Sequence, residues 1–547
     1  MWRYFNTLRY LKLSQIIYRI FKKFPWSFKM IDLVSFPETR SNTFLVASPI
    51  EYPQCITDKC KFHFLNQNVE REIETVWNCG ELPKLWLYNL HYFNDLKSVD
   101  SKERQVLLQS IILSWIDQNP PGHGVGWEPY PLSIRIVNLV KWQLSKPNFD
   151  TNIVASLAVQ VRYLEANIEY HLKGNHLFSN AKALVFAGYF FNGPEATTWL
   201  QKGMKILIDE VSKQILSDGG HYERSTMYHA LSLEDMLDLE NLILSKPDLF
   251  LHYQLHLELW PKIIDKMISW LISMSHPDGN ISFFNDASFG VAPPNVEILS
   301  YAKRLGHIIV KDTKDVVYLK DTGYIRVVKG PITLLIDVAA VGPDYIPAHA
   351  HADSLSYELS YKDQRVIVNS GTSLYEQGSA RDFQRGTSAH STVEIDFENS
   401  SEVWHSFRVA RRAKVYDVAI ERVNNRIVIT AKHNGYLRFK KQTIHKRTWI
   451  IDANSLEIKD EILGGFSTAI SRHYLHPEIK VKKTKYQNKL SLGKFDDVSL
   501  QIDNDNISTY PSHWHPEFGV SVPNLCLQQK INFNNLGNCC RLKFIFD

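Results

Sequence analysis

The sequence predicts an α+β chain in which a helical part comes first and a β-rich part follows. Its 547 residues exceed what one ordinary hydrophobic core serves. Between about residues 82 and 301, apolar residues recur at helical spacing, whereas short β-branched runs follow from about residue 309. Helices and strands segregated in this way are typical of α+β proteins with separate domains. We therefore expect a basic lead-in at 1–80, a helical domain at 81–310 and a β domain at 311–547.

The helical part is predicted from amphipathic periodicity. Ile153, Leu157, Val161 and Leu164 recur at steps of three or four residues and would share one helix face. Short polar loops such as NPPGHG and SHPDGN separate successive segments. Many amphipathic helices with short connections fit a bundle, a solenoid or a toroid, and no fixed repeat period selects among them. The expected helices cover 101–116, 132–140, 153–168, 182–191, 196–216, 231–244 and 257–274.

The second part is predicted to be mainly antiparallel β-structure, in the form of a sandwich. Its apolar runs are short, rich in Val and Ile, and mostly bounded by Gly, Asn, Asp and Lys. The expected strands cover 324–329, 332–338, 354–360, 365–369, 391–395, 426–430 and 447–452.

Composition excludes some classes of protein. A net charge of only +4 argues against a nucleic-acid partner. The aromatic content of 12% suits a sugar-binding cleft, where rings stack on sugars, but also an aromatic core. None of the six cysteines forms a CxxC pair, so a zinc knuckle is not expected and the redox compartment stays open.

The N-terminal segment is basic and amphipathic. Residues 1–30 contain seven Lys and Arg residues but no Asp or Glu. Leu13, Ile16, Ile17 and Ile20 could share one helix face, which fits peripheral contact with an anionic membrane or a helix docked on the rest of the protein. No secretory signal peptide is evident and no stretch is apolar enough to span a bilayer, which favours a cytoplasmic or membrane-peripheral location.

The segment AHAHADSLSYEL is the strongest single indication of chemistry. If it is a strand, His349, His351 and Asp353 leave from one face. Two imidazoles and a carboxylate placed together suit a metal, an anionic ligand or proton transfer. The alternative is a surface strand with solvated histidines.

Polar and aromatic clusters near predicted helix starts and loops are the next candidates. Such positions on a rigid scaffold are where sites are usually built, although caps and core residues have the same composition. The clusters contain Asn89, His91, Tyr92, Trp127, Arg135, Asn175, His176, Tyr222 and Tyr228.

The β domain adds candidate metal ligands at strand ends. His351 and His390 with one oxygen donor would make a three-ligand site with an open position. The oxygen donor could be Asn369 or Asp353. Ordinary strand-end and turn residues are the alternative interpretation of this group, to which Tyr375 also belongs.

Taken together, the motifs GNHLFSN, DGGHYERSTMYH, AHAHADSLSYEL and NSGTSLY with RGTSAHSTVEID resemble those of the heparinase II/III-like polysaccharide lyases. The opening TLRYLKLSQIIYRI also resembles relatives encoded beside bacterial surface-polysaccharide genes. The resemblance covers nearly the whole chain. It implies an incomplete N-terminal (α/α) toroid, a C-terminal antiparallel β-sandwich and a cleft between them.

The chemistry implied by the resemblance is β-elimination at a uronic acid. A base takes the C5 proton, the substrate carboxylate is neutralised, and the bond to the 4-oxygen breaks. Asn175 and His176 match the residues assigned to neutralisation, and His349 matches the catalytic histidine. Tyr228 matches the tyrosine that serves as base, acid or both, with Tyr222 as the alternative assignment. A base role requires the phenolate, which cationic neighbours would favour.

The remaining expectations also follow from the resemblance. His351 and His390 match metal ligands, with Asn369 where relatives have an acidic one, so a weakened zinc site or none is expected, and no organic cofactor. The partner would be an acidic polysaccharide, which implies the periplasm or cell envelope. The expected substrate contacts are Asn89, His91, Tyr92, Trp127, Arg135, Tyr222 and Tyr375.

Three other functions stay open from the sequence. A uronyl C5-epimerase shares the proton abstraction but does not break the chain. A non-catalytic protein of surface-polysaccharide assembly would fit the basic N-terminus. A glycoside hydrolase would need a carboxylate pair, for which Glu128, Asp218, Glu223 and Asp286 are candidates without an evident pairing.

Overall fold

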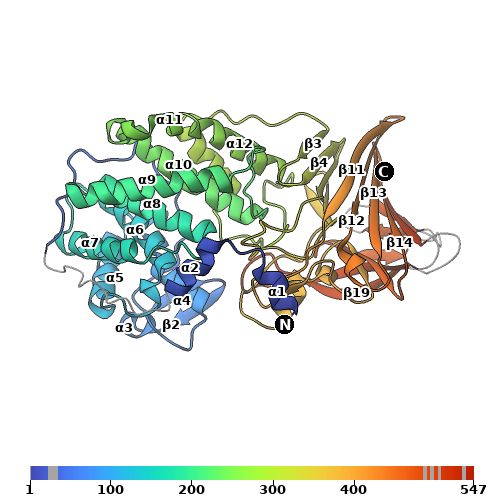
Figure 1. The fold of residues 1–547 in the computed structure, drawn as a ribbon, viewed down its shortest axis with the longest axis horizontal. Coiled ribbons are helices and arrows are strands. Elements are labelled where there is room, and N and C mark those ends of the chain that lie inside the picture. Colours follow the sequence, from blue (N-terminus) through green and yellow to red (C-terminus); the bar gives the residue numbers. More distant parts are fainter. Residues whose placement is uncertain are drawn as a thin grey trace.

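The computed structural model describes residues 2–21, 35–483, 489–492, 498–502, 507–531 and 538–546. Helices form one side of the molecule and β-sheets the other (Figure 1). The last helix before the sheets, α13 (Asn295–Arg304), is followed by β3 (Val316–Leu319). The chain is an incomplete (α/α) toroid followed by an antiparallel β-sandwich, as the sequence predicts.

Long amphipathic helices build the toroid because their apolar faces bury against one another. Leu157, Val161 and Leu164 of α7 are fully buried, as their spacing predicts. The toroid contains α3 (Ile73–Val76), α4 (Lys84–Tyr92), α5 (Gln105–Gln118), α6 (Pro129–Leu144), α7 (Thr151–Ala166), α8 (Gly174–Phe190), α9 (Pro194–Gln214), α10 (Thr226–Ser245), α11 (Gln254–Leu257), α12 (Trp260–Ser273) and α13. A hairpin of β1 (Lys61–Phe64) and β2 (Gln67–Glu70) precedes them.

Two sheets enclose the main core of the β domain. One has the order β3-β4-β5-β6-β7, and the other β11-β12-β13-β14-β21-β18-β17-β16. Residues of both sheets meet in one apolar cluster. The strands are β4 (Tyr324–Lys329), β5 (Ile332–Asp337), β6 (Tyr357–Tyr361), β7 (Gln364–Ile367), β11 (Val415–Val423), β12 (Arg426–His433), β13 (Ile444–Asp452), β14 (Ser455–Leu463), β16 (Val481–Lys483), β17 (Lys489–Leu492), β18 (Val498–Ile502) and β21 (Cys539–Phe546).

A third sheet, in the order β19-β20-β15-β8, lies beside these two and near the toroid junction. Phe289, which precedes α13, bridges Glu517 after β19, so this sheet contacts the helical side directly. The remaining elements are β8 (Val393–Ile395), β9 (Val403–Trp404), β10 (Arg408–Val409), α14 (Ser379–Arg385), β15 (Ala469–Tyr474), β19 (Ile507–Trp514) and β20 (Val522–Ile531).

The segment before β6 is not the strand that alternation predicted. The strand begins only at Tyr357, and Leu355 has a left-handed φ of 63°. His349, His351 and Asp353 therefore lie in an irregular segment, and the argument that they share a strand face was wrong. An irregular path has no fixed side-chain period, so neighbouring side chains can turn toward one common partner.

The N-terminal helices α1 (Trp2–Leu8) and α2 (Leu13–Phe21) lie at the junction of the two domains (Figure 1). Leu13, Ile16, Ile17 and Ile20 are exposed, so the apolar face of α2 is not packed on the protein. The membrane contact expected for residues 1–30 falls partly on 22–30, which lie outside the described residues. None of the described helices is long and apolar enough to cross a membrane.

Candidate active site

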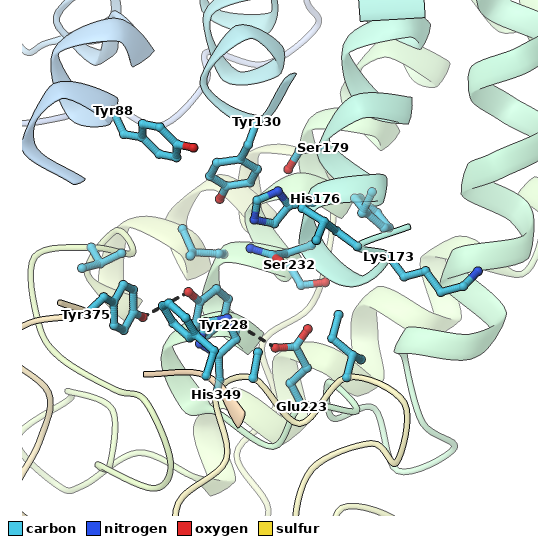
Figure 2. Close-up of a pocket in the computed structure, with 18 of the residues that line it drawn as sticks. Tyr88, Tyr130, Lys173, His176, Ser179, Glu223, Tyr228, Ser232, His349 and Tyr375 are labelled. Atoms are coloured by element: carbon cyan, nitrogen blue, oxygen red, sulfur yellow. Dashed lines mark hydrogen bonds and ion pairs between the residues drawn. The ribbon is translucent and has the colours of Figure 1, made fainter. Parts of the chain in front are cut away.

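A cavity of about 1080 Å³ lies between the toroid and the β domain. Its walls come from α1, α2, α4, α6, α8 and α10 on the helical side. The β domain contributes segments around His349, Tyr375 and Arg408. Figure 2 shows Tyr130 and His176 on one side of the space, with Tyr228, His349 and Tyr375 on the other.

Asp286 organises the β-domain wall although it does not line the cavity. Its carboxylate accepts from His349 Nδ1 at 2.9 Å and from His351 Nε2 at 2.8 Å. Both carboxylate oxygens also accept from the Arg381 guanidinium, at 2.7 Å for Oδ2. Burial alone would raise the pKa of Asp286, but Arg381 and the two histidine hydrogen bonds hold it well below its usual range. Asp286 is therefore ionised.

An ionised acceptor at Nδ1 fixes the tautomer of His349. The Nδ1 atom must carry the proton it donates to Asp286, which leaves a lone pair on Nε2. Burial lowers the pKa of His349, with Asp286 opposing the shift in part, so the ring is neutral near pH 7. A neutral imidazole with Nε2 at the cavity wall is able to accept a proton.

Tyr228 stands next to this base. It lies in the first turn of α10, where the Ser225 side chain accepts from its backbone N–H at 3.1 Å. Its ring centroid is 3.9 Å from that of His349, and its hydroxyl is 3.1 Å from the Tyr375 hydroxyl. Burial, then Tyr375, raises the pKa of Tyr228 well above its ordinary value. The expectation that cationic neighbours favour the phenolate was wrong, and the group is poised to give a proton instead.

The start of α8 supplies the opposite wall. The Tyr130 hydroxyl hydrogen-bonds the Asn175 side chain, and the Tyr130 ring stacks on His176 at 4.4 Å. His176 Nδ1 lies 3.1 Å from the Glu169 carboxylate. Side-chain donors at the positive end of a helix are suited to a carboxylate ligand.

Glu223 lies beside this helix start and is nearly fully buried. Neither of its carboxyl oxygens has a hydrogen-bond partner in the described structure, and Oε2 lies 3.8 Å from His349 Nε2. Burial, then Asp286, raises the pKa of Glu223 to about 8, so it is mostly protonated at neutral pH. Gly174 allows this approach: a Cβ there would lie 3.0 Å from Glu223 Oε1 and 2.9 Å from Ile346. Its φ of +61° is also one that favours glycine.

Three expected substrate contacts lie in the hydrophobic core instead. The His91 ring is hydrogen-bonded to the Trp77 carbonyl and to the Trp115 indole, both at 2.9 Å. Arg135 is fully buried and donates to backbone carbonyls, including that of Gly126 at 2.8 Å. The Trp127 indole donates to the Asn119 carbonyl at 3.1 Å. Because none of His91, Trp127 and Arg135 lines the cavity, these assignments were wrong.

The other predicted residues are brought together, with one exception. Asn89, Tyr92, Asn175, His176, Tyr228, His349 and Tyr375 all line the cavity. Tyr222 does not: its ring is buried behind the wall, with its hydroxyl 3.3 Å from the Cβ position of Gly174. This placement favours Tyr228 over Tyr222 as the reacting tyrosine.

The candidate metal ligands lie close together but make a poor donor set. The ring centroids of His351 and His390 are 5.2 Å apart. In the described structure, His351 Nδ1 has no hydrogen-bond partner, so this ring has a nitrogen available to a metal, whereas His390 lies beside the Gln384 backbone. Asn369 is the neutral oxygen donor beside them. Its Oδ1 accepts a hydrogen bond from the backbone N–H of Ser391, the residue after His390. In the described part of the chain, no three His, Cys, Asp or Glu side chains could hold a metal.

Among the described residues, Asp353 does not complete such a group with the two histidines, and its Oδ2 accepts from the backbone N–H of Asn285 at 3.3 Å. Two neutral imidazoles and an amide lack the negative charge that tight zinc sites use. Zinc at His351, Asn369 and His390 therefore stays a prediction.

Four residues of the site were not assigned by sequence reasoning: Tyr130, Glu223, Asp286 and Arg381. Glu223 and Asp286 stood out only as unpaired carboxylates, and Tyr130 only as part of an aromatic cluster. Arg381 lies in α14, between the motifs NSGTSLY and RGTSAHSTVEID and in neither of them. Asp286 and Arg381 act through each other although they are 95 residues apart in sequence.

Comparison with known families identifies the framework. Residues 97–297 match the heparinase II/III N-terminus, and residues 311–533 match the heparinase II/III-like C-terminal domain. The chain belongs to the heparinase II/III-like family. Residues 2–21, with α1 and α2, lie outside both matched regions of this family.

Family relatives and solved structures agree with this assignment. The chain is 22% identical over 419 residues to a heparin-sulfate lyase of Bacteroides stercoris, covering 72% of this chain and 59% of that protein. It is 25% identical over 324 residues to a heparin-sulfate lyase of Pedobacter heparinus, covering 52% of this chain and 47% of that one. The chain thus spans about half to three fifths of the length of these relatives.

Two solved structures have the same fold. A crystal structure of heparinase III superposes with a TM-score of 0.67 at 18% identity, covering 86% of this chain and 78% of that one. A heparan sulfate lyase mutant from Pedobacter heparinus gives 0.59 at 18% identity, covering 89% and 81%.

Proposed function

We propose that this protein is a polysaccharide lyase that cleaves a uronic-acid-containing polysaccharide by β-elimination. The observation that carries the proposal is the pair of His349 and Tyr228 at the cavity wall. His349 has a free lone pair on Nε2 because Asp286 holds its Nδ1 proton. Tyr228 is a protonated phenol with its ring centroid 3.9 Å from that of His349. A proton acceptor and a proton donor are thus neighbours on one side of the cavity (Figure 2).

The step balances with these two groups alone. His349 Nε2 takes the C5 proton, and the electron pair of that C–H bond forms the C4–C5 double bond. The bond between C4 and its oxygen breaks, and the Tyr228 hydroxyl protonates the departing oxygen. The proton on His349 then returns to the Tyr228 phenolate, directly or through solvent. Base and acid on one side of the sugar correspond to syn elimination.

The substrate carboxylate next to C5 has to be stabilised as negative charge moves toward it. Asn175 and His176 at the start of α8 would donate hydrogen bonds to it, with Tyr130 holding Asn175 in place. Glu223 would add a third donor, because a neutral carboxylic acid beside His349 Nε2 can donate a hydrogen bond to a carboxylate. Its buried oxygens without partners favour this role.

The alternatives are less well supported by the geometry. A C5-epimerase needs proton-transfer groups on opposite faces of C5, whereas His349 and Tyr228 are neighbours. A glycoside hydrolase needs two available carboxyl groups, but Asp286 is saturated by Arg381, His349 and His351. A non-catalytic binding protein has no need for a buried carboxylate that fixes one histidine tautomer.

The test is ultraviolet absorbance of the conjugated unsaturated uronate on a panel of uronate polymers. Wild type should produce it, and Tyr228→Phe and His349→Ala should abolish it. Tyr189→Phe is a matched control, since that hydroxyl bonds the Phe44 carbonyl away from the cavity. If no polymer yields product with the wild type, the lyase proposal fails; solvent deuterium entering C5 without cleavage would establish the epimerase instead.

A further inference from the structure

The cations that line the cavity fall into two groups. Four lysines of the toroid are paired with carboxylates of neighbouring helices or loops. Lys141 contacts Asp238 at 2.6 Å and Lys182 contacts Asp235 at 2.6 Å. Other examples are the pairs Lys97–Glu234 at 3.3 Å and Lys84–Glu128 at 2.9 Å. These lysines have no free charge to offer an anionic ligand.

Arg19, Lys173 and Arg408 line the same cavity without such partners. Within the described ranges, none of the three has a carboxylate at ion-pair distance. The Arg408 guanidinium lies over the Trp404 ring at 4.9 Å and near the Tyr4 ring at 5.9 Å. Its charge is thus held at the cavity wall by aromatic rings and not cancelled by an acid.

The N-terminal helices are fixed in this wall by contacts with both domains. Thr7 accepts from the Trp404 indole at 3.2 Å, and Gln15 donates to the Tyr345 carbonyl at 3.3 Å. On the toroid side, Tyr18 stacks on Tyr170 at 4.9 Å. These contacts span the cleft, so α1 and α2 form a wall with a defined position.

The two faces of α2 have different surroundings. Gln15 and Arg19, one turn apart, line the cavity, together with Leu11 just before the helix. Leu13 and Ile17 are absent from the cavity wall and point to solvent, with Leu13 70% exposed. The polar face of the helix is therefore directed at the ligand space. Residues 2–21 lie outside both regions that match the family.

We propose that α1, α2 and the segment Trp404 to Arg408 form an additional subsite for an anionic sugar residue of the same polysaccharide. Arg19 and Arg408 would bind its carboxylate or sulfate, and the Trp404 and Tyr4 rings would contact the sugar face. Lys173, at the start of α8, is the third cation of this cavity without a carboxylate partner among the described residues. The inference rests on the proposed function, since it assigns a second sugar position in the same cavity.

The experiment is steady-state elimination kinetics with the double variant Arg19→Ala, Arg408→Ala. We expect KM to rise by at least about tenfold, with kcat within about twofold, because the subsite binds away from the reacting atoms. The increase should shrink at high salt, which screens the lost attraction. Lys262→Ala is the matched control, because this exposed lysine of α12 lies outside the cavity wall. Arg19→Lys, Arg408→Lys should restore much of the lost affinity.

Running sulfated and unsulfated uronate polymers side by side distinguishes a sulfate ligand from a carboxylate ligand. Thermal unfolding midpoints of all variants should match the wild type, since both arginines are exposed. An unchanged KM, or a fall in kcat alone, overturns the subsite. Absence of product from the wild type refutes the proposed function instead, and titration of the Tyr228→Phe variant with the same polymers then tests the subsite by binding.

Discussion

Replacing Glu223 by glutamine should remove the alkaline limb of the pH profile while leaving much of the activity. The protonated carboxyl is the proposed donor to the substrate carboxylate, and glutamine keeps a donor that does not titrate. A pKa of about 8, against 4.5 for an ordinary glutamate, means that ionising Glu223 costs about 5 kcal/mol more in the folded protein than in water. At pH 7 about nine molecules in ten carry the proton.

The direction of the pH dependence follows from the protonation state of Glu223 that is active. Because the pKa of Glu223 is raised, the active protonated form is present below about 8 and is lost as pH rises through that value. Wild-type kcat/KM should therefore fall above about pH 8. Tyr228 ionises only at still higher pH, since its pKa is raised well above its ordinary value, so it does not produce this limb.

The magnitude can be set by comparison with alanine. Losing one hydrogen bond to a charged group costs roughly 1.5–3 kcal/mol, so Glu223→Ala should lower kcat/KM by roughly 10- to 150-fold. Glu223→Gln should lose less than about tenfold. Initial rates of unsaturated product would be measured between about pH 6 and pH 10. Glu210→Gln is the control, because Glu210 is equally buried and accepts from Gln214 Nε2 at 2.7 Å but does not itself line the cavity.

Two results would refute the role of Glu223. One is an alkaline limb in Glu223→Gln that is indistinguishable from the wild type. The other is Glu223→Ala with unchanged kcat/KM, which would mean that the buried carboxyl does not contact the substrate. Unfolding midpoints of both variants identify a loss of folding in Glu223→Ala. The glutamine variant keeps the shape of the side chain and therefore tests the role of Glu223 without that loss.

Three further predictions follow. Asp286→Asn should lower kcat by roughly 10²- to 10⁴-fold without a matching rise in KM, because the amide no longer fixes the His349 tautomer. The expected observation is loss of product formation with normal polymer binding. An unchanged kcat would exclude this role of Asp286. Dialysis against a chelator should leave elimination intact, since the donors at His351 carry no negative charge. The elimination rate and the metal content would be measured on the same dialysed sample. A rate that is lost on dialysis and restored only by added zinc would contradict the prediction. Ile17→Glu, Ile20→Glu should reduce flotation with anionic vesicles if α2 contacts a membrane, and equal flotation with neutral vesicles would exclude the charge-driven contact.

The division into helices and strands was predictable because it depends on local patterns. The α7 face that buries Leu157, Val161 and Leu164 is set by a spacing of three or four residues, and the strand expected at 324–329 is β4 to the residue. The same reasoning failed for 354–360, where Leu355 adopts a left-handed conformation. Leu355 is buried in the core of the β domain, and no local pattern encodes its backbone conformation.

The residues of the site were predictable where a sequence motif contains the reacting residue. They were not predictable where a residue acts by positioning another residue. His349 and Tyr228 lie in recognisable motifs, whereas Arg381 reaches Asp286 across 95 residues of sequence. Arg135 shows the opposite error. An arginine beside an aromatic cluster fits a substrate contact, but here its guanidinium lies 3.9 Å from the Trp115 ring and satisfies carbonyls in the core. Sequence alone does not separate these two uses of the same side chain.

The charge distribution in the cavity shows why function needs the tertiary structure. A count of lysines and arginines in the lining would give a uniformly basic cleft, yet Lys141 and Lys182 are neutralised by Asp238. Among the described residues that line the cavity, the cations without a carboxylate partner are Arg19, Lys173 and Arg408. A polymer would be selected by the spacing of its charges, because it must place one uronate at His349 and a second anion at Arg19. On the proposed function and subsite, selectivity among acidic polysaccharides would depend on Arg19 and Arg408 as well as on the groups that perform the elimination.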